Sequence, residues 1–207
     1  MTAVELEALL ARLDEAWRSQ GADIAGNALP GLTDAQIDER ITPLGVVLPE
    51  ELRTWWRWHD GVRGGLEAFA NDYDEASIGP GEWQLVSLDE AVERYQFEDR
   101  TAQYAEDPIA GEYYWRDSWF PFVQAGSNDV LFVDTTVLTE DRTSPIRCRL
   151  SWNWDGWDAV QAHSLADAVA VWLRALTAGH YRWNATSHEW DHDRPSMPGH
   201  FRQGLLL

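Results

Sequence analysis

One stretch restricts the possible folds of this chain more than any other: residues 44–61 read LGVVLPEELRTWWRWHDG. Pro49 stands where the first helical residue would lie, a position at which its missing N–H costs little. Asp60 and Gly61 follow, and glycine favours the left-handed geometry that ends a helix. The side chains between them recur every three or four residues, which predicts one helical face made of Leu52, Trp55, Trp56 and His59. A short helix so rich in tryptophan needs a large apolar surface, so we expect Leu52 and Trp56 to dock on a sheet.

Further helices are indicated on both sides of this stretch. An apolar stripe at helical spacing predicts a first helix that ends near Gly21. A side-chain oxygen followed three residues later by Gln, Glu or Asp is typical of a helix N-terminus. Four such pairs predict helix starts: Thr2 with Glu5, Thr33 with Gln36, Ser87 with Glu90, and Ser164 with Asp167. In the helix of residues 44–61, Glu50 and Glu51 occupy the first turn, where carboxylates are favoured by the helix dipole.

Strand signals dominate the second half of the chain. Apolar runs separated by Gly, Ser, Asn and Asp predict strands joined by hairpin turns. The predicted strands are residues 83–86, 119–124, 129–134, 147–154 and 157–162, with a last small hairpin at 181–183 and 189–190. Helices at the start, then hairpins, then a helix, without strand–helix alternation, predict an α+β fold. We expect a mainly antiparallel sheet of about four to six strands with helices packed against it.

The length of 207 residues predicts a single domain. Residues 1–32 would form an N-terminal helix and linker, residues 33–180 the core, and residues 181–207 a C-terminal hairpin and a loosely held tail. Residues 62–81, rich in glycine and acidic side chains, are predicted to be a loop. Residues 97–117 show no clear period and receive no assignment.

The charge of the chain limits its partners. Its 35 acidic and 16 basic residues give a net charge of −19, which repels phosphate backbones and anionic lipid but attracts a basic protein. Every basic residue is arginine, so P-loop phosphate binding and Schiff-base chemistry are excluded. The single Cys148 allows no internal disulfide, and the sequence pattern predicts neither secretion nor membrane insertion. We therefore expect a cytoplasmic protein without nucleic-acid or membrane partners.

Tryptophan is unusually abundant, with 13 residues. This exceeds what one core usually absorbs, so some indoles are expected to be half exposed, as interface anchors are. Packing at the edge of the core is the alternative. On the helix of residues 44–61, Trp55 or Trp58 would be available for contact.

One sequence pattern resembles a metal site. His188, Glu189 and His192 form H-E-x-x-H, which on a helix places two imidazoles one turn apart to bind zinc. Here Trp190 favours a hairpin, and residues four apart on a strand lie about 13 Å from each other, too far for one metal ion. We expect a cluster of polar residues, with no metal or other cofactor, and keep a zinc metallohydrolase as an alternative. His59 is expected to be a satisfied core or cap histidine, with a lone titrating group as the other possibility.

The order of these motifs resembles the SUKH superfamily, which includes fungal cell-wall assembly regulators of the Smi/Knr type and many bacterial immunity proteins. The similarity spans roughly residues 33–180. A helix after Leu-Pro-x-x-Leu and a hairpin that ends in an acidic residue are its recurrent marks. The residues that match the first mark are Leu48, Pro49, Leu52, Trp56, His59 and Gly61. Those that match the second are Pro121, Phe122, Gly126, Asp129 and Asp134.

The resemblance implies a non-enzymatic protein-binding module with structural roles for these residues. Bacterial members typically neutralise a cognate toxin, often a nuclease, by binding it, and a strongly acidic chain fits a basic toxin. The alternative is an intracellular regulatory or scaffold protein like the fungal regulators. The oligomeric state is not indicated by the sequence.

Two acidic segments form the predicted contact surface. The first comprises Asp72, Tyr73, Asp74 and Glu75, and the second Asp155, Trp157 and Asp158. Loops carry binding residues more often than regular elements do, and acidic side chains would complement a basic partner. A merely solvated acidic face is the alternative.

Overall fold

The computed structural model describes residues 3–64, 76–103, 115–126, 129–139, 143–149 and 160–192. The N-terminal part contains α1 (Ala3–Gln20), α2 (Ile24–Asn27), β1 (Ala28–Pro30), α3 (Asp34–Ile41), η1 (Thr42–Leu44), α4 (Glu50–Trp58) and β2 (His59–Val62). The middle contains η3 (Pro80–Glu82), β3 (Gln84–Leu85), α6 (Leu88–Gln103), β4 (Trp119–Ala125) and β5 (Asp129–Asp134). The last part contains β6 (Ile146–Arg149), β7 (Val160–Ala162), α8 (Leu165–Thr177), β8 (Tyr181–Asn184) and β9 (Glu189–His192).

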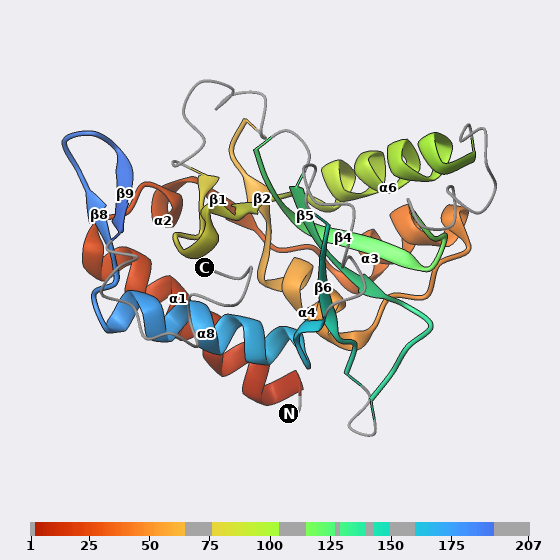
Figure 1. Cartoon of the computed structure of the whole chain (residues 1–207), viewed down its shortest axis with the longest axis horizontal. Coiled ribbons are helices and arrows are strands. Elements are labelled where there is room, and N and C mark those ends of the chain that lie inside the picture. Colours follow the sequence, from red (N-terminus) through yellow and green to blue (C-terminus); the bar gives the residue numbers. More distant parts are fainter. Residues whose placement is uncertain are drawn as a thin grey trace.

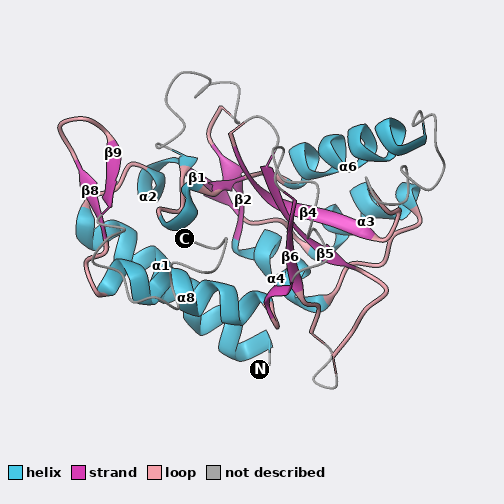
Figure 2. Ribbon diagram, in the orientation of Figure 1, coloured by secondary structure: helices cyan, strands magenta, loops and turns pink. Residues whose placement is uncertain are grey.

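An antiparallel sheet of five strands, in the order β3-β4-β5-β6-β7, forms the centre of the fold. Two small two-stranded sheets, β1-β2 and β8-β9, lie outside it. Helices α1 and α8 run side by side along one side of the molecule, and α6 packs against β4 (Figure 1). Figure 2 shows the helices gathered around the strands. The predicted α+β fold with a mainly antiparallel sheet is confirmed.

Aromatic side chains join α4 to the sheet. Trp55 lies edge-on to Phe122 with 5.9 Å between ring centroids, and Trp56 lies edge-on to Phe120 at the same distance. Trp55 also contacts Trp172 of α8. Leu52 and Trp56 are fully buried, as expected for the docking face. The opposite face of the sheet carries a second cluster of buried side chains: Trp115, Trp119, Val130 and Phe132.

The tryptophan content is explained by the core. Within the described ranges only Trp58 is partly exposed, and the other nine indoles are buried. Several of them donate to distant backbone carbonyls: Trp17 to Ile78 at 3.1 Å and Trp190 to Ser77 at 3.2 Å. Among the ten described tryptophans, Trp58 alone meets the expectation of half-exposed indoles. Trp55 is not available for contact because Phe122 and Trp172 cover it.

The predicted capping pairs are present where the structure describes them. Thr33 and Gln36 form a reciprocal capping box at α3, Ser87 and Glu90 do so at α6, and the Ser164 hydroxyl accepts from the Asp167 N–H at α8. Satisfying the free N–H groups of a helix start stabilises each helix by about 1 kcal/mol. These local signals therefore predicted the helix starts correctly.

The end of α4 differs from the prediction. The helix stops at Trp58, and His59 already has extended geometry (φ −144°), so Asp60 and Gly61 belong to β2 and do not form the helix cap. The reason is that β1, which lies in the predicted N-terminal linker, pairs with β2. This pairing requires an extended backbone from His59 onward, so the helix ends before that residue. Of residues 97–117, for which the sequence predicted no structure, residues 97–103 belong to α6, which continues to Gln103.

Two carboxylates of this stretch cap other helices. Glu51, 7% exposed, accepts the backbone N–H groups of Leu165 and Ala166 at 3.3 and 3.2 Å, at the first turn of α8. Asp60 accepts the N–H of Leu88, the first residue of α6, at 2.8 Å. Both carboxylates complement the positive end of a helix dipole. They fix α8 and α6 relative to α4 and β2.

Removing the Glu51 cap should destabilise the fold. Glu51→Ala leaves two buried N–H groups without their acceptor, so we expect the free energy of unfolding to fall by about 2 kcal/mol. Glu50→Ala is the matched control, because this neighbouring side chain is 56% exposed and only pairs with Arg57; a loss of less than about 1 kcal/mol is expected. Urea unfolding followed by tryptophan fluorescence measures both values. Equal losses in the two variants would contradict the capping role.

Gly61 is required by a close approach of two backbones. A Cβ at this position would lie 2.5 Å from the Ser87 nitrogen, and the residue has φ +75°. We expect Gly61→Ala to lower the free energy of unfolding by about 3 kcal/mol, since overpacking adds to the cost of left-handed geometry. Gly45→Ala, with φ +69° and open space around the new methyl group, should cost only about 1 kcal/mol. Thermal unfolding of the two variants checks the difference, and similar melting temperatures would argue against the steric explanation.

Candidate functional site

The predicted contact residues Asp72, Tyr73, Asp74, Glu75, Asp155, Trp157 and Asp158 all lie outside the described residues. What the structure does describe is how the chain is held beside them. Ser77 forms a bridge with Gln84, and the register then runs through Gln124 and Val130 to Arg149. Ser77, two residues after the first predicted segment, and Arg149, six residues before the second, are therefore held at the same end of the sheet. Ser77 and Arg149 are separated by four strand spacings, or about 19 Å.

Residues 76–80, which include Ala76, Ser77 and Ile78, are buried. The Trp17 indole donates to the carbonyl of Ile78, and the Trp190 indole donates to the carbonyl of Ser77. A Cβ added at Gly79 would contact Leu176 and Trp190 at 3.2 to 3.4 Å. The loop predicted for residues 62–81 is thus fixed at its C-terminal end by α1, α8 and the β8-β9 hairpin.

The residues shared with the SUKH pattern occupy structural positions. Leu48, Leu52, Trp56 and Phe122 are buried, and Pro49 precedes α4 as its N-cap residue. Pro121 pairs with Phe132 next to a β-bulge, while Gly126 and Asp129 flank the β4-β5 turn. Asp134 accepts the N–H and hydroxyl of Thr136 at 3.0 and 2.6 Å. Burial raises the pKa of Asp134, but these hydrogen bonds and the charge of Arg147 outweigh it and lower that pKa below its ordinary value.

His59 belongs to a polar network between three elements. Its Nδ1 lies 2.8 Å from the carbonyl oxygen of Leu29 in β1, and its Nε2 lies 3.0 Å from Asp14 of α1. Because a carbonyl oxygen only accepts, Nδ1 carries a proton. Both ring nitrogens thus have polar partners, so His59 is a satisfied histidine, in agreement with the prediction.

Asp14 is the centre of this network. It accepts from His59, from the Trp58 indole N–H at 3.2 Å, and pairs with Arg18 at 3.3 Å. Burial raises the pKa of Asp14, yet the hydrogen bond and charge of His59, the Trp58 hydrogen bond and the Arg18 charge together lower it below its ordinary value of 3.8. The carboxylate is therefore ionised at neutral pH and holds the Trp58 ring in place.

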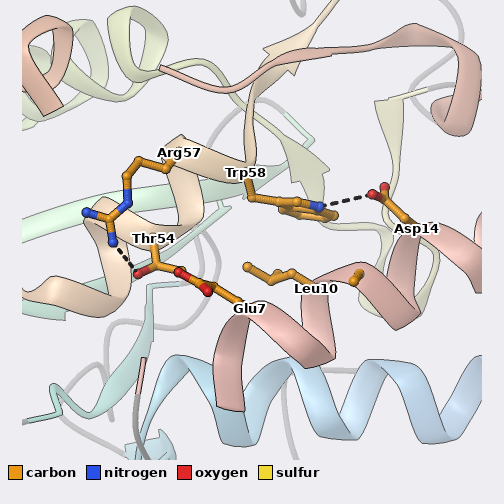
Figure 3. A pocket seen from close by; sticks show the side chains of 7 residues that line it. Glu7, Leu10, Asp14, Thr54, Arg57 and Trp58 are labelled. Atoms are coloured by element: carbon orange, nitrogen blue, oxygen red, sulfur yellow. Dashed lines mark hydrogen bonds between the residues drawn. The ribbon is translucent and has the colours of Figure 1, made fainter. Parts of the chain in front are cut away.

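A cleft of about 240 Å³ lies beside this network, between α1 and α4 (Figure 3). Its walls are formed by Glu7, Leu10, Ala11, Asp14, Thr54, Arg57 and Trp58. In Figure 3 the Trp58 indole lies over Leu10 with its nitrogen directed at Asp14, while Arg57 is turned toward Thr54. The sequence interpretation missed this cleft. The signal was the spacing of Glu7, Leu10 and Asp14, which places acidic and apolar side chains on one face of α1.

The H-E-x-x-H pattern lies in a hairpin, as its tryptophan predicted. His188 sits in the turn with φ +57° and its Nδ1 is 2.5 Å from Asp23, whereas His192 ends β9 and its Nε2 is 3.9 Å from Glu82. The two imidazoles thus face different carboxylates. Among the described residues no group of three or more His, Cys, Asp or Glu side chains is arranged to hold a metal ion.

The chain belongs to the SMI1/KNR4 family (SUKH-1), whose model matches residues 31–174. The resemblance inferred from the two motifs is thereby confirmed. No curated protein matches the chain. Helix α1, which forms one wall of the cleft, precedes the matched segment. None of the helices in the described ranges is long and apolar enough to cross a membrane.

The Asp14 network should make stability depend on pH. Asp14→Asn weakens charge-assisted hydrogen bonds, so we expect a loss of about 1–2 kcal/mol in unfolding free energy at pH 7. Because the folded pKa is lower than the unfolded one, the contribution of Asp14 is complete above pH 3.8 and is lost as the pH falls below it. Urea unfolding at pH 7 and pH 3 should show the difference between wild type and Asp14→Asn shrinking at the lower pH.

Glu15→Gln serves as the control for this measurement. Glu15 is the next acidic residue on α1 and is exposed, so its substitution should change stability little at either pH. A wild-type-to-Asp14→Asn difference that is as large at pH 3 as at pH 7 would contradict the assignment of the effect to the ionised carboxylate.

Proposed function

We propose that this chain is a protein-binding module of the immunity type that binds and neutralises a cognate basic toxin, and that it has no catalytic activity of its own. Membership of the SMI1/KNR4 family fits a module of immunity or regulatory type, and the family is generally non-enzymatic. The net charge of −19 is the observation that favours a basic toxin as the partner. We expect the complex to form in the cytoplasm.

Electrostatics supports a toxin that itself binds nucleic acid. An acidic protein can occupy the basic cleft of a nuclease in place of the phosphate backbone, and opposite net charges speed association of two proteins. The proposed contacts are the acidic segments 72–75 and 155–158, with Ser77 near the first and Arg149 near the second held at one end of the sheet. Anchored residues near a contact segment favour binding because they reduce the entropy lost when the complex forms.

A regulatory or scaffold role is the second candidate. The family takes its name from SMI1 and KNR4, and a module of that kind would bind a resident enzyme of the cell in place of a toxin. The genomic neighbourhood separates the two: a toxin gene next to this one supports immunity, whereas an isolated gene supports regulation.

Co-expression with the toxin encoded by a neighbouring gene tests the proposal. We expect a stable complex and survival of the host cells, and an association rate that falls steeply as salt is raised. Replacing Asp72, Asp74 and Glu75 with Asn, Asn and Gln should weaken the complex. The control is Glu15→Gln, Glu39→Gln and Glu93→Gln, which removes the same number of charges from exposed positions elsewhere.

Two results would reject parts of this proposal. No complex and no protection would reject the immunity function. Equal weakening by the two triple variants would show that net charge, and not the 72–75 segment, drives binding.

A further inference from the structure

We propose that the cleft between α1 and α4 binds an arginine side chain of the basic partner. This inference rests on the proposed function, because it assigns a second contact to the same partner. It adds a recognition site on α1 that lies apart from the predicted acidic segments and outside the segment matched by the family model.

The size of the cleft fits a single side chain. Its volume of about 240 Å³ is below the roughly 300–1,000 Å³ of sites that enclose whole small-molecule ligands. Ala11, which is exposed, lines the cleft beside the buried Leu10 and would contact the aliphatic part of a long side chain. A folded partner can reach such a cleft by inserting one extended residue.

The charges around the cleft favour a cation. Glu7 is exposed and makes no hydrogen bond or ion pair within the part of the chain that the structure describes. Asp14 already interacts with His59, Trp58 and Arg18, so Glu7 is the carboxylate in the wall that is left to pair with a bound cation. The one cation in the wall, Arg57, is already paired with Asp34 at 3.1 Å and with Glu50 at 2.5 Å, so its charge is compensated. An anionic ligand would face two carboxylates at this site.

The aromatic wall favours arginine over other cations. Trp58 is the partly exposed indole among the described tryptophans, and indole is the side chain with the strongest attraction for cations. Its ring is held by the hydrogen bond to Asp14 and by stacking on Trp17, with 5.4 Å between centroids. A planar guanidinium group can stack on such a ring and pair with a carboxylate at the same time, which the compact ammonium group of lysine cannot do.

Titration with N-acetyl-arginine amide tests the cleft directly. We expect a saturable shift of the Trp58 indole N–H signal in a ¹H–¹⁵N spectrum at millimolar probe, with Trp58→Phe used only to assign the signal. N-acetyl-citrulline amide, which has the same shape without the charge, should give no saturable shift. Glu7→Gln should weaken arginine binding about two- to fivefold, and the control Glu15→Gln on the same helix should not.

The outcomes separate this inference from the proposed function. If citrulline amide binds as well as arginine amide, or if Glu7→Gln binds like wild type, the cleft is not an arginine site. If the chain protects against the toxin but Glu7→Gln binds that toxin as tightly as wild type, the cleft inference fails and the immunity function stands. If arginine amide binds with the expected dependence on Glu7 while no toxin is bound, the cleft stands and the immunity function fails.

Discussion

The structure depends on two acidic side chains, one in the short helix α4 and one in the strand that follows it, which cap the starts of two other helices. Glu51 in α4 accepts two N–H groups at the start of α8, and Asp60 in β2 accepts one at the start of α6. Burial raises the pKa of both carboxyl groups, although the backbone hydrogen bonds lower it in part. The contribution of each group to stability is therefore largest below its unfolded pKa and is lost as the pH rises through its folded pKa. The pH dependence of the Asp14 contribution has the opposite sign. Above the folded pKa of Glu51 or Asp60, the caps are ionised at a cost, which the helix dipoles offset in part.

Indole N–H groups perform a similar task between distant segments. Trp17 and Trp190 hold the chain after residue 75, and Trp56 donates to the carbonyl of Val86 at 3.4 Å. A tryptophan at these positions fills the core and satisfies a buried carbonyl at once. The abundance of tryptophan, which the sequence suggested as a sign of an interface, is thus mainly a structural feature of the described part of the chain.

Local patterns predicted the fold well because they depend only on residues that are close in the sequence. The capping pairs at Thr33, Ser87 and Ser164 and the β4-β5 hairpin need only a few adjacent side chains, and each was identified correctly. The predicted end of α4 was wrong because β2 pairs with β1, and this pairing overrides the helix signal. The paired residues lie about 30 positions apart in the sequence. The role of Glu51 was missed for the same reason: the N–H groups that donate to it lie more than a hundred residues away. The candidate cleft was missed because its two walls come from separate helices.

Contacts with several other elements hold the residues of the cleft, and this bears on how it would recognise a partner. Asp14 orients Trp58 and His59 together, His59 is bonded to Leu29 in β1, and β2 continues from His59 to Gly61, which lies against Ser87 at the start of α6. The indole wall is therefore tied to the sheet through backbone and side-chain contacts before any ligand binds. Binding to a fixed site loses less entropy than ordering a flexible one, so a single arginine can contribute measurably to affinity. Because α1 lies outside the family-matched segment, this contact would distinguish the partner of this chain from partners of proteins that share only the family core.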